Sequence, residues 1–120
     1  MPSKDPAKDP AQRFENILQN ITRIRSHTEG MDELGFLEDD KSIDAVERCI
    51  ERIAEAVRKI GDQFDMEYPD LDLPSLRQFG SVLRHDYDSV QPVLVWGFVR
   101  DRLDPLENMA RKQLGRLSTD

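Results

Sequence analysis

The sequence has few of the side chains that hold metals or form disulfides, with two histidines and one cysteine in 120 residues. A single cysteine, Cys49, excludes an internal disulfide framework and is typical of a reducing compartment. So few histidines and cysteines form no zinc-binding pattern, and we expect neither a metal nor a cofactor. Because no CxxC or histidine spacing surrounds Cys49, we interpret it as a small buried residue.

Long hydrophobic runs are also missing. None approaches the roughly 20 residues that span a bilayer, and the N-terminus lacks the apolar segment of a signal peptide. We therefore expect a cytoplasmic protein.

Acidic side chains outnumber basic ones by 24 to 17, which gives a net charge of −7. Because this charge repels polyanions on average, any nucleic-acid site must be a local basic patch.

The residues that are present favour amphipathic helices. The composition is 38% hydrophobic and 34% charged, which is polar for a globular protein but outside the disordered range. No segment alternates with a period of two, so strands are not expected. We predict one all-α domain over residues 11–120, an up-and-down bundle of about four to five helices. A flexible tail precedes it over residues 1–10.

Apolar spacings of three and four residues place the first two long helices. The first covers residues 11–27, with Asp9 as a possible N-cap and Pro10 in its first turn. The clearest stripe runs over residues 43–60, where apolar side chains recur in one seam. Gly61 follows as a helix stop.

The second half of the chain is predicted to hold two further helices. Residues 61–74 are interpreted as a polar loop, and a third helix covers about residues 75–87. A fourth begins near Pro92, and Asp104 is a candidate N-cap where it kinks or restarts. Its predicted inward-facing residues are Val93, Trp96, Val99 and Leu103.

The segment LRHDYD, residues 83–88, carries the groups most capable of chemistry. An imidazole such as that of His85 can take and return a proton near neutrality, because the ordinary pKa of histidine is about 6.5. The guanidinium of Arg84 can bind a phosphate oxygen. The hydroxyl of Tyr87 can donate a hydrogen bond to developing negative charge. Together these groups could cleave RNA without a metal.

The same cluster is compatible with an ordinary helix end. In that interpretation His85 lies near the negative end of the helix dipole, Tyr87 lies at the core edge and Arg84 is solvated. Replacing His85 would then change only stability. The other histidine, His27, lies near the end of the first helix and is interpreted in this way.

The order of several motifs resembles a known family. Those motifs are HTEGM, FLEDD, SIDAVERCIERIAEAV, YPDLDLP, GSVLRHDYD and VLVWGFVRDRLDPL. Together they extend over about residues 13–115 and resemble the HepT family of the HEPN superfamily, which are toxins of bacterial toxin–antitoxin pairs.

The resemblance implies an all-α homodimer with its active sites in a cleft at the interface. Such proteins are metal-independent RNases with an arginine, a spacer of four to six residues, a histidine, any residue and a tyrosine. The histidine falls on His85 and the tyrosine on Tyr87, while Glu55 and Asp86 are supporting acidic residues. The implied partner is an MntA-like nucleotidyltransferase, which neutralises the toxin by transferring AMP to Tyr87. Single-stranded RNA is the expected substrate.

The sequence departs from this pattern at one place. The spacer calls for arginine within residues 78–80, where the chain has glutamine, phenylalanine and glycine. The nearest arginines are Arg77 and Arg84, and either is a candidate for holding phosphate. The departure favours an alternative function, in which the chain is a non-catalytic, dimeric helical subunit that binds a nucleotidyltransferase.

Overall fold

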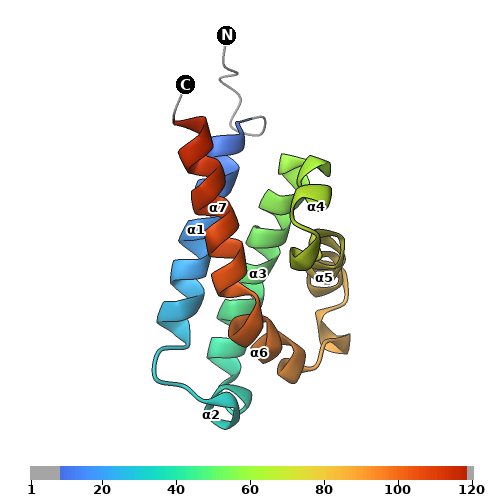
Figure 1. The fold of residues 1–120 in the computed structure, drawn as a ribbon. Helices are drawn as coiled ribbons and strands as arrows, with labels where there is room; N and C mark the ends of the chain where they lie inside the picture. The colour runs from blue at the N-terminus through green and yellow to red at the C-terminus, as the bar shows by residue number, and fades with distance from the viewer. Residues whose placement is uncertain (1–8, 119–120) are drawn as a thin grey trace.

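The computed structural model describes residues 9–118, and within them the chain is all-α (Figure 1). Four long helices form the body: α1 Pro10–His27, α3 Asp40–Ile60, α5 Leu73–His85 and α7 Leu103–Leu117. The predicted all-α bundle is confirmed. Residues 1–8, most of the predicted tail, lie outside the described residues.

Shorter elements connect the long helices. They are α2 Glu33–Leu37, α4 Gln63–Glu67, the 3-10 turns η2 Pro69–Leu71 and η3 Tyr87–Ser89, and α6 Pro92–Asp101.

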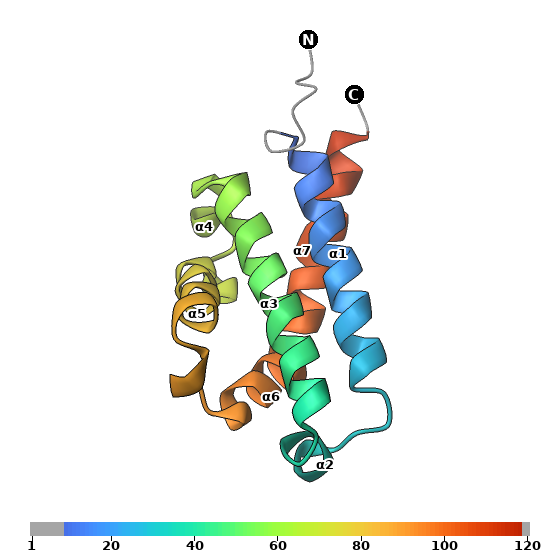
Figure 2. The same cartoon turned by 180° about the vertical axis from the view of Figure 1, so that it is seen from behind.

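Helix α3 lies at the centre of the bundle. It packs on α1 along one side and on α5 along the other, while α7 packs on α1 (Figures 1 and 2). Helices α2 and α6 close one end of the bundle, and α4 lies at the opposite end. Within residues 9–118, no helix combines the length and hydropathy that crossing a bilayer requires.

Capping residues set the start of α1, as the sequence predicted, and also the start of α3. The Asp9 carboxylate accepts a hydrogen bond from the Ala11 amide at 3.0 Å, and that of Asp39 accepts one from the Ser42 amide at 3.1 Å. Gly61 ends α3 with φ +89°, a conformation that glycine adopts without steric cost.

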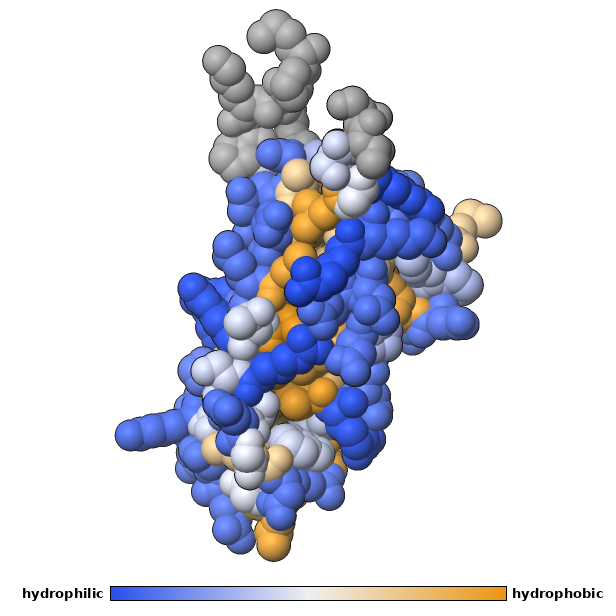
Figure 3. Space-filling view, turned by 60° about the vertical axis from the view of Figure 1, so that its left-hand side comes forward, coloured by the Kyte–Doolittle hydropathy of each residue, from blue (hydrophilic) through white to orange (hydrophobic). Residues whose placement is uncertain are grey.

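The predicted seam of α3 forms the middle of the core. Its buried members are Ile43, Val46, Ile50, Ile53, Val57 and Ile60. Cys49 is also buried, as predicted, and burial raises the pKa of its thiol. The outer surface is correspondingly polar. The side of the bundle in Figure 3 is mainly hydrophilic, with hydrophobic side chains visible along a narrow seam.

The prediction of a polar loop over residues 61–74 is wrong. This segment contains α4, η2 and the first residues of α5. The Phe64 ring meets Phe14 of α1 edge-on at 5.6 Å between centroids, and Leu73 is fully buried. These turns are too short to show a helical period, and contacts with α1 and the core hold them in place.

The prediction of which residues of the fourth helix face inward is also partly wrong. The structure buries Val95 and Phe98 of α6, whereas Val93 is 43% exposed. Asp104 is not an N-cap, because α7 already begins at Leu103. The Asp104 carboxylate instead pairs with Arg25 of α1 at 2.6 Å. These residues therefore tie α7 to α1.

Candidate functional site

A close approach between α3 and α5 sets the geometry of the candidate site. Gly80 of α5 is buried against Ala54 of α3, and an ideal Cβ at position 80 would lie only 2.2 Å from the Ala54 Cβ. Two small residues therefore let the helices meet almost backbone to backbone. The polar residues one turn further along α5 are thereby held beside α3.

Polar residues of the two helices line one cavity of about 240 Å³, here called the α3–α5 groove. Its lining residues are Glu51, Ala54, Glu55 and Arg58 of α3, with Arg77, Gly80, Ser81, Arg84 and His85 of α5. The structure therefore brings His85, Arg84 and Glu55 together, although Glu55 lies about thirty positions earlier in the sequence.

His85 is the last residue of α5, and its side chain is exposed. Asp86 ends the helix, and its carbonyl accepts hydrogen bonds from the Ser89 amide at 3.1 Å and the Ser89 hydroxyl at 2.8 Å. This turn anchors the backbone directly after His85. Tyr87 begins η3, but the predictions for Tyr87 concern its side chain, which lies outside what the structure describes.

Glu55 is held as a carboxylate in the groove. Two hydrogen bonds from Arg58 lower the pKa of Glu55, and the charges of Arg58, Lys59 and Arg84 lower it further. Because Glu55 keeps its negative charge near neutrality, it attracts the Arg84 guanidinium across the groove.

Arg77 lies in the same groove, but its donors are engaged elsewhere. Its guanidinium binds both carboxylate oxygens of Asp65, at 2.6 and 2.9 Å, and the Gly61 carbonyl at 3.1 Å. These contacts join α5 to the end of α3 and to α4. The sequence made Arg77 a candidate phosphate ligand. In the structure its guanidinium instead stabilises the packing of α5 against α4 and the end of α3.

We expect Arg77→Gln to lower the free energy of unfolding at pH 7 by about 1–2 kcal/mol, because a bidentate, largely buried pair is lost. Arg77 lowers the pKa of Asp65, so this stabilisation is present above the unfolded pKa of about 4 and disappears as pH falls through the lower folded value. Urea unfolding at pH 7 and below pH 4 measures both effects. Asp65→Asn should match Arg77→Gln, whereas Arg100→Gln, which breaks an exposed pair, should change nothing measurable. A loss that is independent of pH would contradict the assignment.

Packing accounts for the absence of arginine at positions 79 and 80. A Cβ at Gly80 would collide with Ala54, and the Phe79 ring stacks on that of Phe98 at 6.3 Å between centroids. Gln78 is exposed on the side of α5 away from the α3–α5 groove, where it lines a cavity with Phe79. Arg84 is therefore the groove arginine nearest to His85 in the chain.

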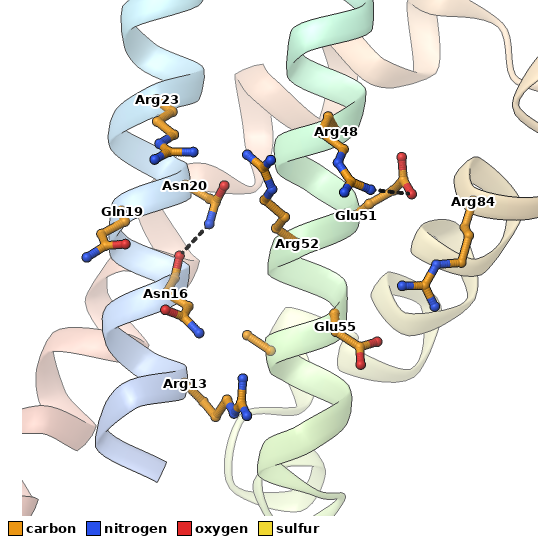
Figure 4. A pocket seen from close by; sticks show the side chains of 11 residues that line it. Arg13, Asn16, Gln19, Asn20, Arg23, Arg48, Glu51, Arg52, Glu55 and Arg84 are labelled. Carbon is orange, nitrogen blue, oxygen red and sulfur yellow. Dashed lines mark hydrogen bonds and ion pairs between the residues drawn. The ribbon is translucent and has the colours of Figure 1, made fainter. Parts of the chain in front are cut away.

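A second cavity, of about 340 Å³, lies between α1 and α3 and was not predicted from the sequence (Figure 4). We call it the α1–α3 groove. Its lining residues are Arg13, Asn16, Gln19, Asn20 and Arg23 of α1, Arg48, Glu51, Arg52, Glu55 and Ala56 of α3, and Arg84 of α5. Figure 4 shows Arg13 and Arg23 extending from α1 toward α3, and Arg84 reaching from α5 toward Glu55.

The sequence contained one signal for this groove. Arg48 and Arg52 are four residues apart and therefore lie on one face of α3. In a chain with net charge −7, two arginines at this spacing do not by themselves indicate a basic surface. Which face of α1 they oppose depends on how the two helices pack, and helical periodicity alone does not show that.

Comparison with known proteins shows the family to which the chain is similar. The family model described as "Ribonuclease HepT-like" matches residues 17–113. One similar protein of Methanocaldococcus jannaschii, named "Putative RNase", is 30% identical over 98 residues, covering 82% of this chain and 81% of that protein. A second protein of the same name and organism is 32% identical over 91 residues, covering 76% and 78%. No solved structure matches the chain significantly.

Proposed function

The chain belongs to the HepT-like ribonuclease family, and we propose that it is a metal-independent endoribonuclease acting as the toxin of a toxin–antitoxin pair. The observation that supports this most is the α3–α5 groove, where His85, Arg84 and Glu55 meet. An exposed imidazole beside a guanidinium can supply both the proton transfer and the charge stabilisation of metal-independent phosphodiester cleavage.

In the proposed reaction, neutral His85 takes the proton of a ribose 2′-hydroxyl. The 2′-oxygen attacks the adjacent phosphorus, and the bond from phosphorus to the 5′-oxygen breaks. The leaving oxygen gains that proton back from the imidazolium, directly or relayed through a water molecule. The products are therefore a 2′,3′-cyclic phosphate and a 5′-hydroxyl, and the enzyme returns to its starting state.

Arg84 is the better candidate for holding the phosphate. It forms no ion pair within 4.0 Å in residues 9–118 and lines both grooves. Arg77 binds Asp65 and the Gly61 carbonyl, so its binding of phosphate would require those contacts to break. We therefore assign neutralisation of the developing phosphorane charge to Arg84.

We also propose that the chain forms a homodimer through α5 and α6. The outer side of these helices carries two shallow, mainly apolar grooves that share Phe79 and Leu94. Leu94 is 58% exposed, and the neighbouring Val93 is 43% exposed. Because this face belongs to the same helix as His85, pairing through it would place the α5 helices of the two copies next to each other. Light scattering at micromolar concentration should show twice the mass of 13.9 kDa.

The proposed control of the toxin acts at Tyr87. An MntA-like nucleotidyltransferase encoded beside it would transfer AMP from ATP to the tyrosine hydroxyl and release pyrophosphate. This would add a negative charge and a bulky group two residues from His85. Both effects exclude RNA from the α3–α5 groove.

Expression in cells tests this assignment. The chain expressed alone should arrest growth, and His85→Ala should relieve the arrest. Co-expression with the neighbouring nucleotidyltransferase should restore growth and add one AMP to the intact mass, and Tyr87→Phe should prevent that addition. Normal growth on expression alone, with Tyr87 unmodified, would contradict the toxin assignment.

A second function is favoured by the absence of arginine at residues 78–80. In it the chain is a non-catalytic, dimeric binding subunit of the nucleotidyltransferase. Purified protein with unmodified Tyr87 distinguishes the two: the toxin cleaves RNA, whereas the binding subunit forms a stable complex with the nucleotidyltransferase and cleaves nothing.

A further inference from the structure

The arginines of this chain are used very unevenly. Of the twelve arginines, seven pair with carboxylates, and Arg102 donates to the carbonyls of Leu71 and Asp72. The arginines with neither kind of partner within residues 9–118 are Arg13, Arg23, Arg52 and Arg84. All four line the α1–α3 groove. In a chain with seven more negative than positive charges, carboxylates were available to pair with them.

The groove carries local positive charge as a result. Its five arginines face two carboxylates, Glu51 and Glu55. Arg48 is the only one of the five with an acidic partner within residues 9–118, and it lies 3.6 Å from Glu51. Four unpaired guanidinium groups in one concave surface repel one another, and an anion bound between them would remove that repulsion.

Two buried polar atoms of the groove also lack hydrogen-bond partners within residues 9–118. They are the side-chain oxygen of Asn20, a residue that is only 6% exposed, and the Nε of Arg13. The Asn20 amide nitrogen donates to the Asn16 carbonyl at 2.8 Å, which leaves the oxygen free to accept. Because an unmet buried polar atom destabilises the fold, these atoms indicate a ligand that completes them.

The ligand must carry both acceptors and a donor. Phosphate oxygens can accept hydrogen bonds from the arginines, but an ionised phosphodiester offers no donor for Asn20. A nucleotide offers both, because its sugar hydroxyl and base amino groups donate. The groove therefore fits a nucleotide better than it fits inorganic phosphate.

The groove is continuous with the candidate active site. Glu51, Glu55 and Arg84 line both cavities, so the α1–α3 groove leads across α3 directly to His85. A strand with its cleaved phosphodiester at His85 would pass Arg84 and then run between α1 and α3. A flexible single strand can follow this path, because its backbone is not constrained by pairing.

We propose that the α1–α3 groove is a second RNA-binding subsite, which holds the nucleotides flanking the cleaved bond. Arg13, Arg23 and Arg52 bind their phosphates, and Asn20 accepts from a sugar or base donor. This placement of the strand rests on the proposed RNase function, but binding of RNA in the groove can be measured separately from cleavage.

The test uses full-length protein carrying His85→Ala, so that RNA binds without being cut. Fluorescence anisotropy measures the Kd of a single-stranded RNA of about ten nucleotides, a typical site size for such grooves. Arg13→Gln/Arg52→Gln should weaken binding about tenfold or more and reduce the salt slope of log K by about 1.4, from two lost phosphate contacts. The matched control is Arg100→Gln/Arg111→Gln, which removes the same charge outside both grooves and should change Kd less than about twofold.

The outcomes separate this proposal from the proposed function. Equal effects of the two double variants would mean that only overall charge matters and would overturn the subsite. If wild-type protein cleaves no RNA but the groove variant still binds it selectively worse than the control does, the RNase assignment fails and the subsite stands. Displacement of the RNA by micromolar AMP would show a mononucleotide pocket and would overturn the strand assignment.

A second variant tests the side-chain oxygen of Asn20, which accepts no hydrogen bond within residues 9–118. Asn20→Leu removes the free acceptor, while the Asn16 carbonyl keeps its helical bond. We expect RNA affinity to fall several-fold with no decrease in melting temperature, since the oxygen stabilises nothing in the free protein. A lower melting temperature with unchanged Kd would show that Asn20 serves the fold and would count against its contact with RNA.

Discussion

His85→Ala should reduce the rate of RNA cleavage by about 10²–10⁴-fold, the range that general acid–base catalysis contributes. The proposed reaction needs a group that takes a proton from the 2′-hydroxyl and returns one to the leaving oxygen. Within the α3–α5 groove the imidazole is the group whose ordinary pKa suits both steps. Because the His85 side chain is exposed, its removal should change the free energy of unfolding by only about 0.5 kcal/mol or less.

His27→Ala is the matched control. His27 also ends a long helix and is exposed, but it lies on α1, outside both grooves. Cleavage of a labelled RNA by each purified variant, with thermal unfolding alongside, measures both effects. Full activity of His85→Ala, or an equal loss in both variants, would remove His85 from the chemistry.

Gly80→Ala should destabilise the fold, although alanine is the better helix former by about 1 kcal/mol. The added methyl would lie 2.2 Å from the Ala54 Cβ, so α5 must move away from α3. Overpacking of this kind costs about 1–3 kcal/mol. The displacement also carries Arg84 away from Glu55, so RNA cleavage should fall with stability.

Gly115→Ala is the matched control, and we expect it to raise the free energy of unfolding where Gly80→Ala lowers it. Gly115 lies inside α7, and no atom of the described residues 9–118 comes within 4 Å of a Cβ placed there. This variant should gain about 0.5–1 kcal/mol from helix propensity alone. Urea unfolding compares the two. Ala54→Gly/Gly80→Ala, which moves the small residue to the other helix, should recover part of the loss. Equal stability of Gly80→Ala and Gly115→Ala would show that the close approach does not matter.

The long helices could be predicted because their stability follows local rules. An apolar seam that repeats over about five turns, as on α3, fixes which face of the helix is buried, and Gly61 ends the helix. The N-cap of α1 at Asp9 follows from the same rules. Short elements obey no such periodicity. The segment 61–74 folds into turns because Phe64 and Leu73 reach the core, and these contacts arise only after α1 and α3 have packed.

In the candidate site, too, the residues that are close in sequence could be predicted, whereas those brought together only by packing could not. His85 and Arg84 were found because they are adjacent in the chain, and the family resemblance identified Glu55. The task of Arg77 was missed because its partner, Asp65, lies in a segment interpreted as a loop. The α1–α3 groove was missed because its arginines come from three helices. Four of the five differ from the other arginines in having neither a carboxylate nor a carbonyl partner within residues 9–118.

The most direct test is cleavage of single-stranded RNA in EDTA by purified protein made without its nucleotidyltransferase and carrying unmodified Tyr87. Cleavage that persists in EDTA and leaves 2′,3′-cyclic phosphate and 5′-hydroxyl ends is the predicted result, since the 2′-hydroxyl is the proposed nucleophile. Absence of cleavage, loss of cleavage in EDTA, or products with 3′-hydroxyl ends would contradict a metal-independent RNase centred on His85.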